Sequence, residues 1–181
     1  MSTERNIRAV RLKNDHREML NLKRVGNTID WKVVAGEPPM VEAYELTVQV
    51  KSVIGPEPKY RHEHRISLVL PHGYPSSPPE IRMISDPVVF HPNWFTDHRW
   101  CHNTWSHTTS LGDHVIRMIR TLQYDPEITN ENSPANSRAN EWYVEKKTSG
   151  LFPCDNQILP DPTVVGFAVK TNSRGFVIKN H

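Results

Sequence analysis

The chain of 181 residues is poor in cysteine and in net charge, and each shortage excludes a class of protein. Two cysteines, Cys101 and Cys154, could pair, but they are too few for the disulfide framework of a small secreted domain. The formal net charge is +2 at pH 7, which favours neither nucleic acid nor an acidic membrane as the main partner. We therefore expect no nucleic-acid partner.

Long apolar runs are also lacking. No run approaches the roughly 18 residues of a membrane span, and the charged start "MSTERNIRAVRLKNDHREML" has no stretch typical of a signal peptide. We expect a cytoplasmic protein without a membrane partner, in a compartment where thiols stay reduced. Eight glycines against fifteen prolines favour rigid turns over flexible linkers.

The hydrophobic pattern changes period along the chain. Residues 3–23 predict a polar helix rich in Arg and Lys. Four short segments with apolar alternation or short apolar runs follow: "IDWKVV" (29–34), "AYELTVQVK" (43–51), "HRISLVLP" (64–71) and "EIRMI" (80–84). Short strands joined by tight turns predict an antiparallel meander.

Two helices are predicted after the strands. The first has one apolar face, and Ser110 with Asp113 three residues later is typical of a capping box. Ser133 and Pro134 predict the start of the second, with Ser133 as N-cap and an end near Lys147. The apolar face of the first helix consists of Leu111, Val115, Met118, Ile119 and Leu122.

This order of elements predicts one α+β domain over residues 1–147. Residues 148–181 form an extension of different character, in which "TVVGFAVK" and "GFVIK" could pair as a hairpin packed on the domain.

The stretch "HPNWFTDHRWCHNTWSH" (91–107) concentrates the candidate chemistry around Cys101. One interpretation is a metal site, yet zinc ligands usually come in closely spaced pairs and no second Cys-x-x-Cys is present. Another is a Cys-His hydrolase, whose base the fold would have to supply. A third is a thiol that works without a histidine base. The histidines considered as metal ligands are His91, His98, His102, His107 and His114.

The stretches "YPSSPP", "HPN" and "SPAN" occur in this order, with Cys101 eight residues after Asn93. In these motifs and their separations the chain resembles the ubiquitin-conjugating enzyme family over roughly residues 5–147. The resemblance implies an N-terminal helix, a four-stranded antiparallel meander, an irregular segment that bears the cysteine, and C-terminal helices.

The resemblance also implies an activity. Cys101 would accept a ubiquitin-like protein from an activating enzyme as a thioester and pass it to a lysine of a target protein. ATP would be consumed by the activating enzyme, so this chain would need no cofactor or metal. Asn93 would stabilise the oxyanion or the loop, His91 would support the loop, and Ser133 would orient the lysine or cap a helix.

The first helix is the family's usual docking face for the activating enzyme. Its plausible contacts here are Arg8, Arg11 and Lys13, although an ordinary solvated face would have the same composition.

Several features depart from the family. Trp100 and His102 flank the cysteine where Ile or Val and Leu are usual, and Thr109 stands where tryptophan is general. These departures resemble the bacterial members more than the common eukaryotic ones. A non-catalytic module that binds ubiquitin-like proteins remains an alternative, as do a Cys-His hydrolase and a metal-binding protein.

A contact with a RING-type ligase is not expected. Ser76 follows Tyr74-Pro75 where the family has a bulky apolar residue, and no proline lies between Cys101 and Leu122. A small hydroxyl cannot supply the buried apolar anchor of such an interface.

Overall fold

A long polar helix, α1 (Ser2–Arg24), begins the part of the chain described by the computed structural model, residues 2–164. Most of its residues face water, and one strip is buried against the sheet and α2 (Leu111–Leu122). The helix predicted for residues 3–23 is confirmed. The buried strip consists of Leu12, Asp15, His16, Met19, Asn21 and Leu22, which recur at helical spacing.

Four strands form one antiparallel sheet in the order β1-β2-β3-β4, so the predicted meander is confirmed. Alternate side chains of β2 and β3 enter the core, and the register places Leu46 opposite Ile66 and Ile66 opposite Met83. The strands are β1 (Ile29–Glu37), β2 (Met40–Gly55), β3 (Lys59–Val69) and β4 (Glu80–Met83).

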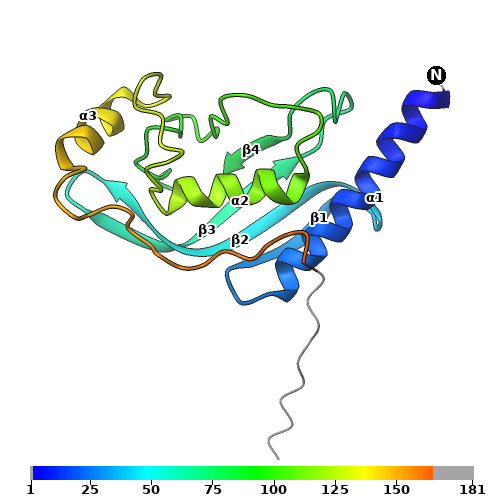
Figure 1. Cartoon of the computed structure of the whole chain (residues 1–181), viewed down its shortest axis with the longest axis horizontal. Coiled ribbons are helices and arrows are strands. Elements are labelled where there is room, and N and C mark those ends of the chain that lie inside the picture. Colours follow the sequence, from blue (N-terminus) through cyan, green and yellow to red (C-terminus); the bar gives the residue numbers. More distant parts are fainter. Residues whose placement is uncertain (1, 165–181) are drawn as a thin grey trace, which may run out of the picture.

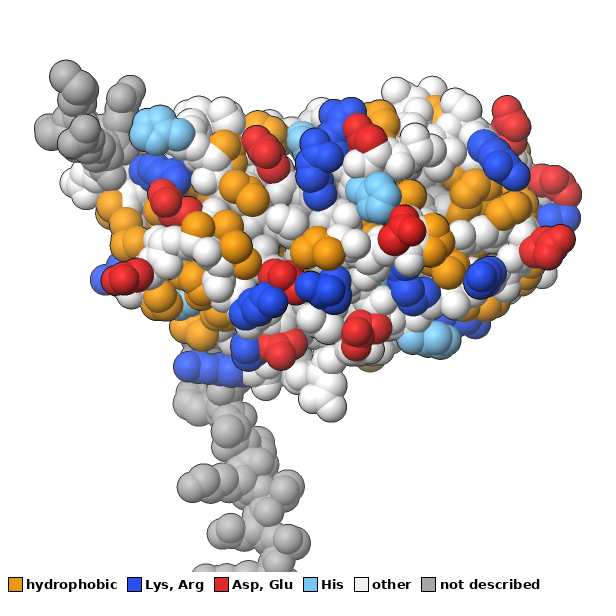
Figure 2. Space-filling model, turned by 180° about the vertical axis from the view of Figure 1, so that it is seen from behind, with side chains coloured by type: hydrophobic (Ala, Val, Ile, Leu, Met, Phe, Trp, Pro, Cys, Tyr) orange, Lys and Arg blue, Asp and Glu red, His pale blue; other side chains and the backbone are white. Residues whose placement is uncertain are grey.

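Helix α2 lies across one face of the sheet, with α1 near one end and α3 (Ser137–Lys146) near the other (Figure 1). The hydroxyl of Ser110 accepts a hydrogen bond from the amide of Asp113 at 3.1 Å, so the predicted cap of α2 is confirmed. The predicted apolar face is buried, and it closes the core between this helix and the sheet. Figure 2, which views the molecule from behind, shows Lys and Arg interspersed with Asp and Glu.

The predicted start of the last helix is wrong. Its N-cap is Asn136, whose side-chain oxygen accepts a hydrogen bond from the amide of Ala139 at 3.0 Å. Ser133 lies outside the helix, exposed in the preceding turn. The amides of Ala135 and Asn136 donate to the carbonyl of Pro92, so a contact distant in sequence holds this segment out of the helix.

The first part of the extension runs back across the domain from α3 to α1 (Figure 1). Asp155 accepts a hydrogen bond from the amide of Lys51 at 2.6 Å, and Pro162 accepts one from the side chain of Asn21 at 2.9 Å. The "GFVIK" part of the predicted hairpin, and most of "TVVGFAVK", lie outside the described residues. Among residues 2–164, no helix has the length and apolar character needed to span a membrane.

Candidate active site

Cys101 lies on an extended segment that continues the sheet beyond β4. The amide of Trp100 donates to the carbonyl of Ile81 at 3.0 Å, and the amide of Cys101 donates to the carbonyl of Asn93 at 2.8 Å. Single bridges also join Arg82 to Arg99 and Trp94 to Trp100. The sheet and the His-Pro-Asn loop therefore both fix the backbone on which the thiol stands.

The two cysteines have different environments, and both are free thiols. Cys154 packs beside Tyr124 and Phe152, and its thiol donates to the carbonyl of Lys51 at 3.2 Å. Burial, followed by the nearby carboxylate of Asp155, raises the pKa of the Cys154 thiol to about 12. Since the thiolate is the nucleophile, the raised pKa makes Cys154 the poorer candidate, and Cys101 remains the candidate nucleophile.

Within residues 2–164, the hydrogen-bond partner of the Cys101 sulfur is an asparagine and not a histidine. Its Sγ lies 3.6 Å from Oδ1 of Asn103, a residue with a φ of 63°. Asparagine tolerates this left-handed conformation better than most residues. Oδ1 of Asn103 also accepts a hydrogen bond from Nδ2 of Asn130 at 3.0 Å.

His91 is completely buried inside the loop that it begins. Its Nδ1 accepts a hydrogen bond from the amide of Asn93 at 2.9 Å, and its ring packs on Tyr124 at 4.3 Å between centroids. Burial lowers the pKa of His91 to about 3, so the imidazole is neutral at pH 7. These contacts are those of a residue that holds a loop.

The carboxamide of Asn93 is also buried, and it binds the loop before α3. Its Oδ1 accepts from the amide of Asn130 at 2.9 Å, and its Nδ2 donates to the carbonyl of Ile128 at 3.3 Å. Asn130 in turn bonds both backbone groups of Ser133. The structure thus brings Cys101, Asn93 and Ser133 into one connected region, with Asn130 as the link.

Asn103 and Asn130 were missed by the sequence reasoning. The stretch "TNENSPAN" (129–136) is typical of turns, because asparagine side chains hydrogen-bond to nearby backbone. That signal predicts a turn but not its contact with Asn103, which lies 27 positions earlier.

The histidines considered as metal ligands have other surroundings. His98 contacts the carbonyl of Met83 at 3.1 Å, and His107 is exposed. His102 is partly buried beside His114, with ring centroids 5.6 Å apart. Among residues 2–164, no group of three or more His, Cys, Asp or Glu is placed to hold a metal ion.

His114 lies at the centre of an aromatic cluster that the sequence reasoning did not find. Its ring packs edge-on against Trp100 at 4.9 Å and Trp105 at 4.8 Å. Burial lowers the pKa of His114 to about 3, helped by the nearby His102 and Arg117. Its position on the apolar face of α2, three residues after Leu111, was the available signal.

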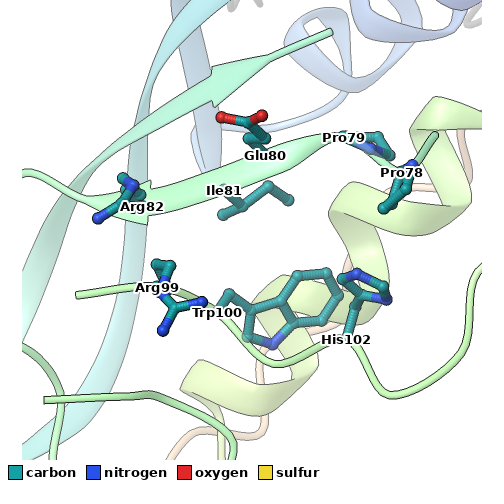
Figure 3. Close-up of a pocket in the computed structure, with 8 residues that line it drawn as sticks. All are labelled: Pro78, Pro79, Glu80, Ile81, Arg82, Arg99, Trp100 and His102. Atoms are coloured by element: carbon teal, nitrogen blue, oxygen red, sulfur yellow. The ribbon is translucent and has the colours of Figure 1, made fainter. Parts of the chain in front are cut away.

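A groove of about 370 Å³ lies between β4 and residues 99–102, and Trp100 and His102, the two neighbours of Cys101, are among its lining residues. In Figure 3, Ile81 points toward Trp100 across the groove, while Glu80 projects from the opposite side of the strand. Arg99 is partly neutralised, because its Nε pairs with Asp97 at 2.8 Å. The lining residues are Pro78, Pro79, Glu80, Ile81, Arg82, Arg99, Trp100 and His102.

The three basic residues predicted to bind an activating enzyme differ in accessibility. Arg8 donates to the carbonyl of Pro71 at 2.9 Å, and Arg11 donates to the carbonyl of His107 at 2.8 Å. Both side chains are only about one-sixth exposed, whereas Lys13 is exposed. Arg8 and Arg11 therefore fasten the loops around residues 71–79 and 102–110 to α1.

Comparison with known proteins agrees with this geometry. The chain is 30% identical over 130 residues to "Ubiquitin-conjugating enzyme E2 2" of Candida albicans, a match that covers 66% of this chain and 69% of that protein. The chain belongs to the ubiquitin-conjugating enzyme family. The family and the fold predicted by the resemblance are thereby confirmed.

A second relative matches a shorter region of this ubiquitin-conjugating family member. The chain is 36% identical over 87 residues to "Ubiquitin-conjugating enzyme E2 1" of Caenorhabditis elegans, which covers 46% of this chain and 42% of that protein. The match thus spans less than half of the worm protein. No protein-family model matches the chain.

Proposed function

We propose that this protein carries a ubiquitin-like protein as a thioester on Cys101 and transfers it to a lysine of a target protein. The observation that carries the proposal is the contrast between the two thiols within a member of this family. Both thiols are partly exposed, but Cys101 stands on a backbone fixed by the sheet and the His-Pro-Asn loop, whereas the pKa of the Cys154 thiol is raised to about 12.

Loading requires little from the protein besides a reachable thiolate. In transthiolation the Cys101 thiolate attacks the thioester carbon on the activating enzyme, and the thiolate of that enzyme leaves. The two thiolates are similar leaving groups, so no dedicated histidine base is needed. ATP is used by the activating enzyme, and this chain contributes no cofactor.

Transfer to lysine is the harder step, because negative charge develops on the carbonyl oxygen. We assign His91 and Asn93 to holding the loop, an assignment supported by their burial and by the bonds of Asn93 to residues 128–130. We assign Ser133, exposed in the turn held by Asn130, to orienting the incoming lysine.

Lys13 is our candidate contact for the activating enzyme, because it is exposed on α1 while Arg8 and Arg11 are bound within the chain. A RING-type ligase is not required by the proposal. Ser76 leaves the familiar contact without an apolar anchor, and the indole of Trp105 donates to the carbonyl of Pro75 at 2.8 Å, which ties the two loops together.

The test is to incubate the protein with an activating enzyme, ATP and ubiquitin, and then with activating enzymes paired with other ubiquitin-like proteins. We expect an adduct that thiol reagents remove. Cys101→Ala should abolish it, and Cys154→Ala should retain it. Loss of the adduct in a folded Cys154→Ala variant, with Cys101→Ala still charged, would overturn the assignment.

A further inference from the structure

Three asparagines form a chain of hydrogen bonds that ends at the thiol. The amide of Asn130 donates to Oδ1 of Asn93 at 2.9 Å, and its side-chain Nδ2 donates to Oδ1 of Asn103 at 3.0 Å. The thiol of Cys101 faces the same Oδ1 of Asn103 at 3.6 Å. Of the three side chains, that of Asn103 is the one in contact with the sulfur.

The orientation of the Asn130 carboxamide is determined by backbone groups, whose donor and acceptor roles are fixed. Its Oδ1 accepts from the amide of Ser133 at 3.1 Å, and its Nδ2 donates to the carbonyl of Ser133 at 2.7 Å. Exchanging oxygen and nitrogen would break both bonds. The atom of Asn130 that faces Asn103 is therefore a donor.

This fixes the orientation of Asn103 as well. The atom that receives the Asn130 donor must be an oxygen, so Nδ2 of Asn103 lies on the other branch of the carboxamide. The contacts with Asn130 and Cys101 both use Oδ1, so neither of them uses the two N–H donors of Nδ2. Asn103 is exposed, so an acyl group on Cys101 can reach these donors.

The carboxamide of Asn93 is used differently. Its oxygen binds the amide of Asn130, and its nitrogen binds the carbonyl of Ile128. The side chain is 3% exposed, and moving it toward the thiol would break both bonds that hold the 128–130 loop. Asn93 therefore lacks the freedom to follow charge that develops at the thioester.

We propose that Asn103 is the catalytic residue that donates a hydrogen bond to the oxyanion during aminolysis, and that Asn130 positions it. The inference rests on the proposed function, in which Cys101 carries a thioester. The carbonyl oxygen of that thioester is two covalent bonds from Sγ, and Nδ2 of Asn103 is two covalent bonds from Oδ1. An oxyanion donor needs a separation of about 2.7–3.1 Å from the developing charge.

The step balances without a further reactant. The lysine amine attacks the thioester carbon, and the carbonyl π electrons move to the oxygen, where Nδ2–H of Asn103 stabilises the charge. The oxyanion then collapses, the carbon–sulfur bond breaks, and the Cys101 thiolate leaves with the electron pair. The amine loses one proton to water and the thiolate regains one, which gives an amide and a free thiol.

The test separates loading from discharge. The 181-residue protein is loaded from a preformed thioester between ubiquitin and 2-mercaptoethanesulfonate. This thioester exchanges with an accessible thiol without an activating enzyme or ATP. Single-turnover discharge is then measured on addition of free lysine. The variants are Asn103→Ala, Asn103→Asp and Asn130→Ala. Asn132→Ala, an exposed asparagine in the same loop, is the matched control.

We expect all variants to load like the wild type. Asn103→Ala should slow discharge about 10²-fold, the usual effect of one lost oxyanion donor. Asn103→Asp keeps the oxygen that Asn130 binds but loses the donors, so it should be at least as slow. Asn130→Ala should also slow discharge, and the double variant should be no slower than Asn103→Ala, because Asn130 acts through Asn103.

Two results would overturn the inference. One is a discharge rate for Asn103→Ala within roughly twofold of the rate for Asn132→Ala, which would show that Asn103 is not the oxyanion donor. The other is an equal loss of loading and discharge, which would indicate a change in the thiol segment itself. If the wild type fails to load on Cys101, the proposed function fails, and this inference fails with it.

Discussion

Replacement of Asp15 by Asn is expected to lower the free energy of unfolding by about 3 kcal/mol, the lower end of the cost of breaking a buried ion pair. The side chain of Asp15 is 2% exposed and accepts hydrogen bonds from three segments of the chain. The donors are the Tyr74 hydroxyl at 2.6 Å, Nε of Arg11 at 2.9 Å and the amide of Leu111 at 3.2 Å. One carboxylate thus joins α1, the 71–79 loop and the start of α2.

The magnitude follows from burial. Hydrogen bonds to a charged group contribute about 1.5–3 kcal/mol each, and removing one partner of a buried ion pair costs about 3–5 kcal/mol. Asparagine has the shape of aspartate and keeps one acceptor oxygen. The expected loss of unfolding free energy is therefore at the low end of the range of about 3–5 kcal/mol. The comparison is Asp30, whose pair with Lys23 is shorter, at 2.5 Å, but whose side chain is 67% exposed. Asp30→Asn should cost less than about 1 kcal/mol.

The assay is urea unfolding of both variants at pH 7, with the midpoint and the slope measured together. For a chain of this length a loss of about 3 kcal/mol lowers Tm by roughly 6–12 °C. Tyr74→Phe in the Asp15→Asn background should cost less than in the wild type, because the two groups share one bond. If Asp15→Asn matched Asp30→Asn within about 1 kcal/mol, burial would not be what gives the carboxylate its effect.

Three further outcomes are expected. Iodoacetamide at neutral pH should alkylate Cys101 and spare Cys154, whose pKa is raised to about 12; equal labelling by mass spectrometry in the folded protein would contradict this. Lys13→Glu should slow loading by an activating enzyme without changing Tm, whereas Arg8→Ala should lower Tm; thioester gels and thermal unfolding separate the two, and unchanged loading would exclude Lys13. The folded-state pKa of His114 is lowered to about 3, so the unfolded chain binds protons first and stability falls as pH drops below about 6.5. By pH 5 this loss is about 2 kcal/mol, and His114→Phe should flatten the fall; parallel curves for both proteins would refute the assignment.

The parts of the fold that the sequence predicted depend on local periodicity. Each predicted strand lies within an observed strand or overlaps one, because alternation of apolar residues records directly which side chains face the core. The cap of α2 was predicted for the same reason, since Ser110 and Asp113 lie within one turn. The false start of α3 at Ser133 shows the limit: the Ser-Pro signal is local, whereas the bonds to Pro92 that delay the helix are not.

In the candidate site, too, local features were predicted from the sequence and contacts between distant segments were not. The spacing between Asn93 and Cys101 was sufficient to place both in one loop region, but it could not tell that the carboxamide of Asn93 is used by residues 128–130. Nor could it bring Asn130 beside Asn103. These contacts join segments that lie 27 to 37 positions apart in the sequence, so a local pattern cannot reveal them. Sequence reasoning therefore proposed Cys101 as the nucleophile but missed Asn103, whose Oδ1 lies 3.6 Å from its sulfur.

The basic residues of α1 carry this reasoning one step further. A run of Arg and Lys on a polar helix predicts a solvated face. Composition alone cannot tell a basic residue that binds loops of its own chain from one that binds a partner protein. In the structure Arg8 and Arg11 point back into the domain, where they bind carbonyls of the 70–74 and 107–109 segments. Arg11 shares Asp15 with Tyr74, so one charge network holds both loops against the helix. Mutations of these arginines would alter the loops around Cys101, so a loss of partner binding in such variants could come from the changed loops. Only exposed positions such as Lys13 can report on docking itself.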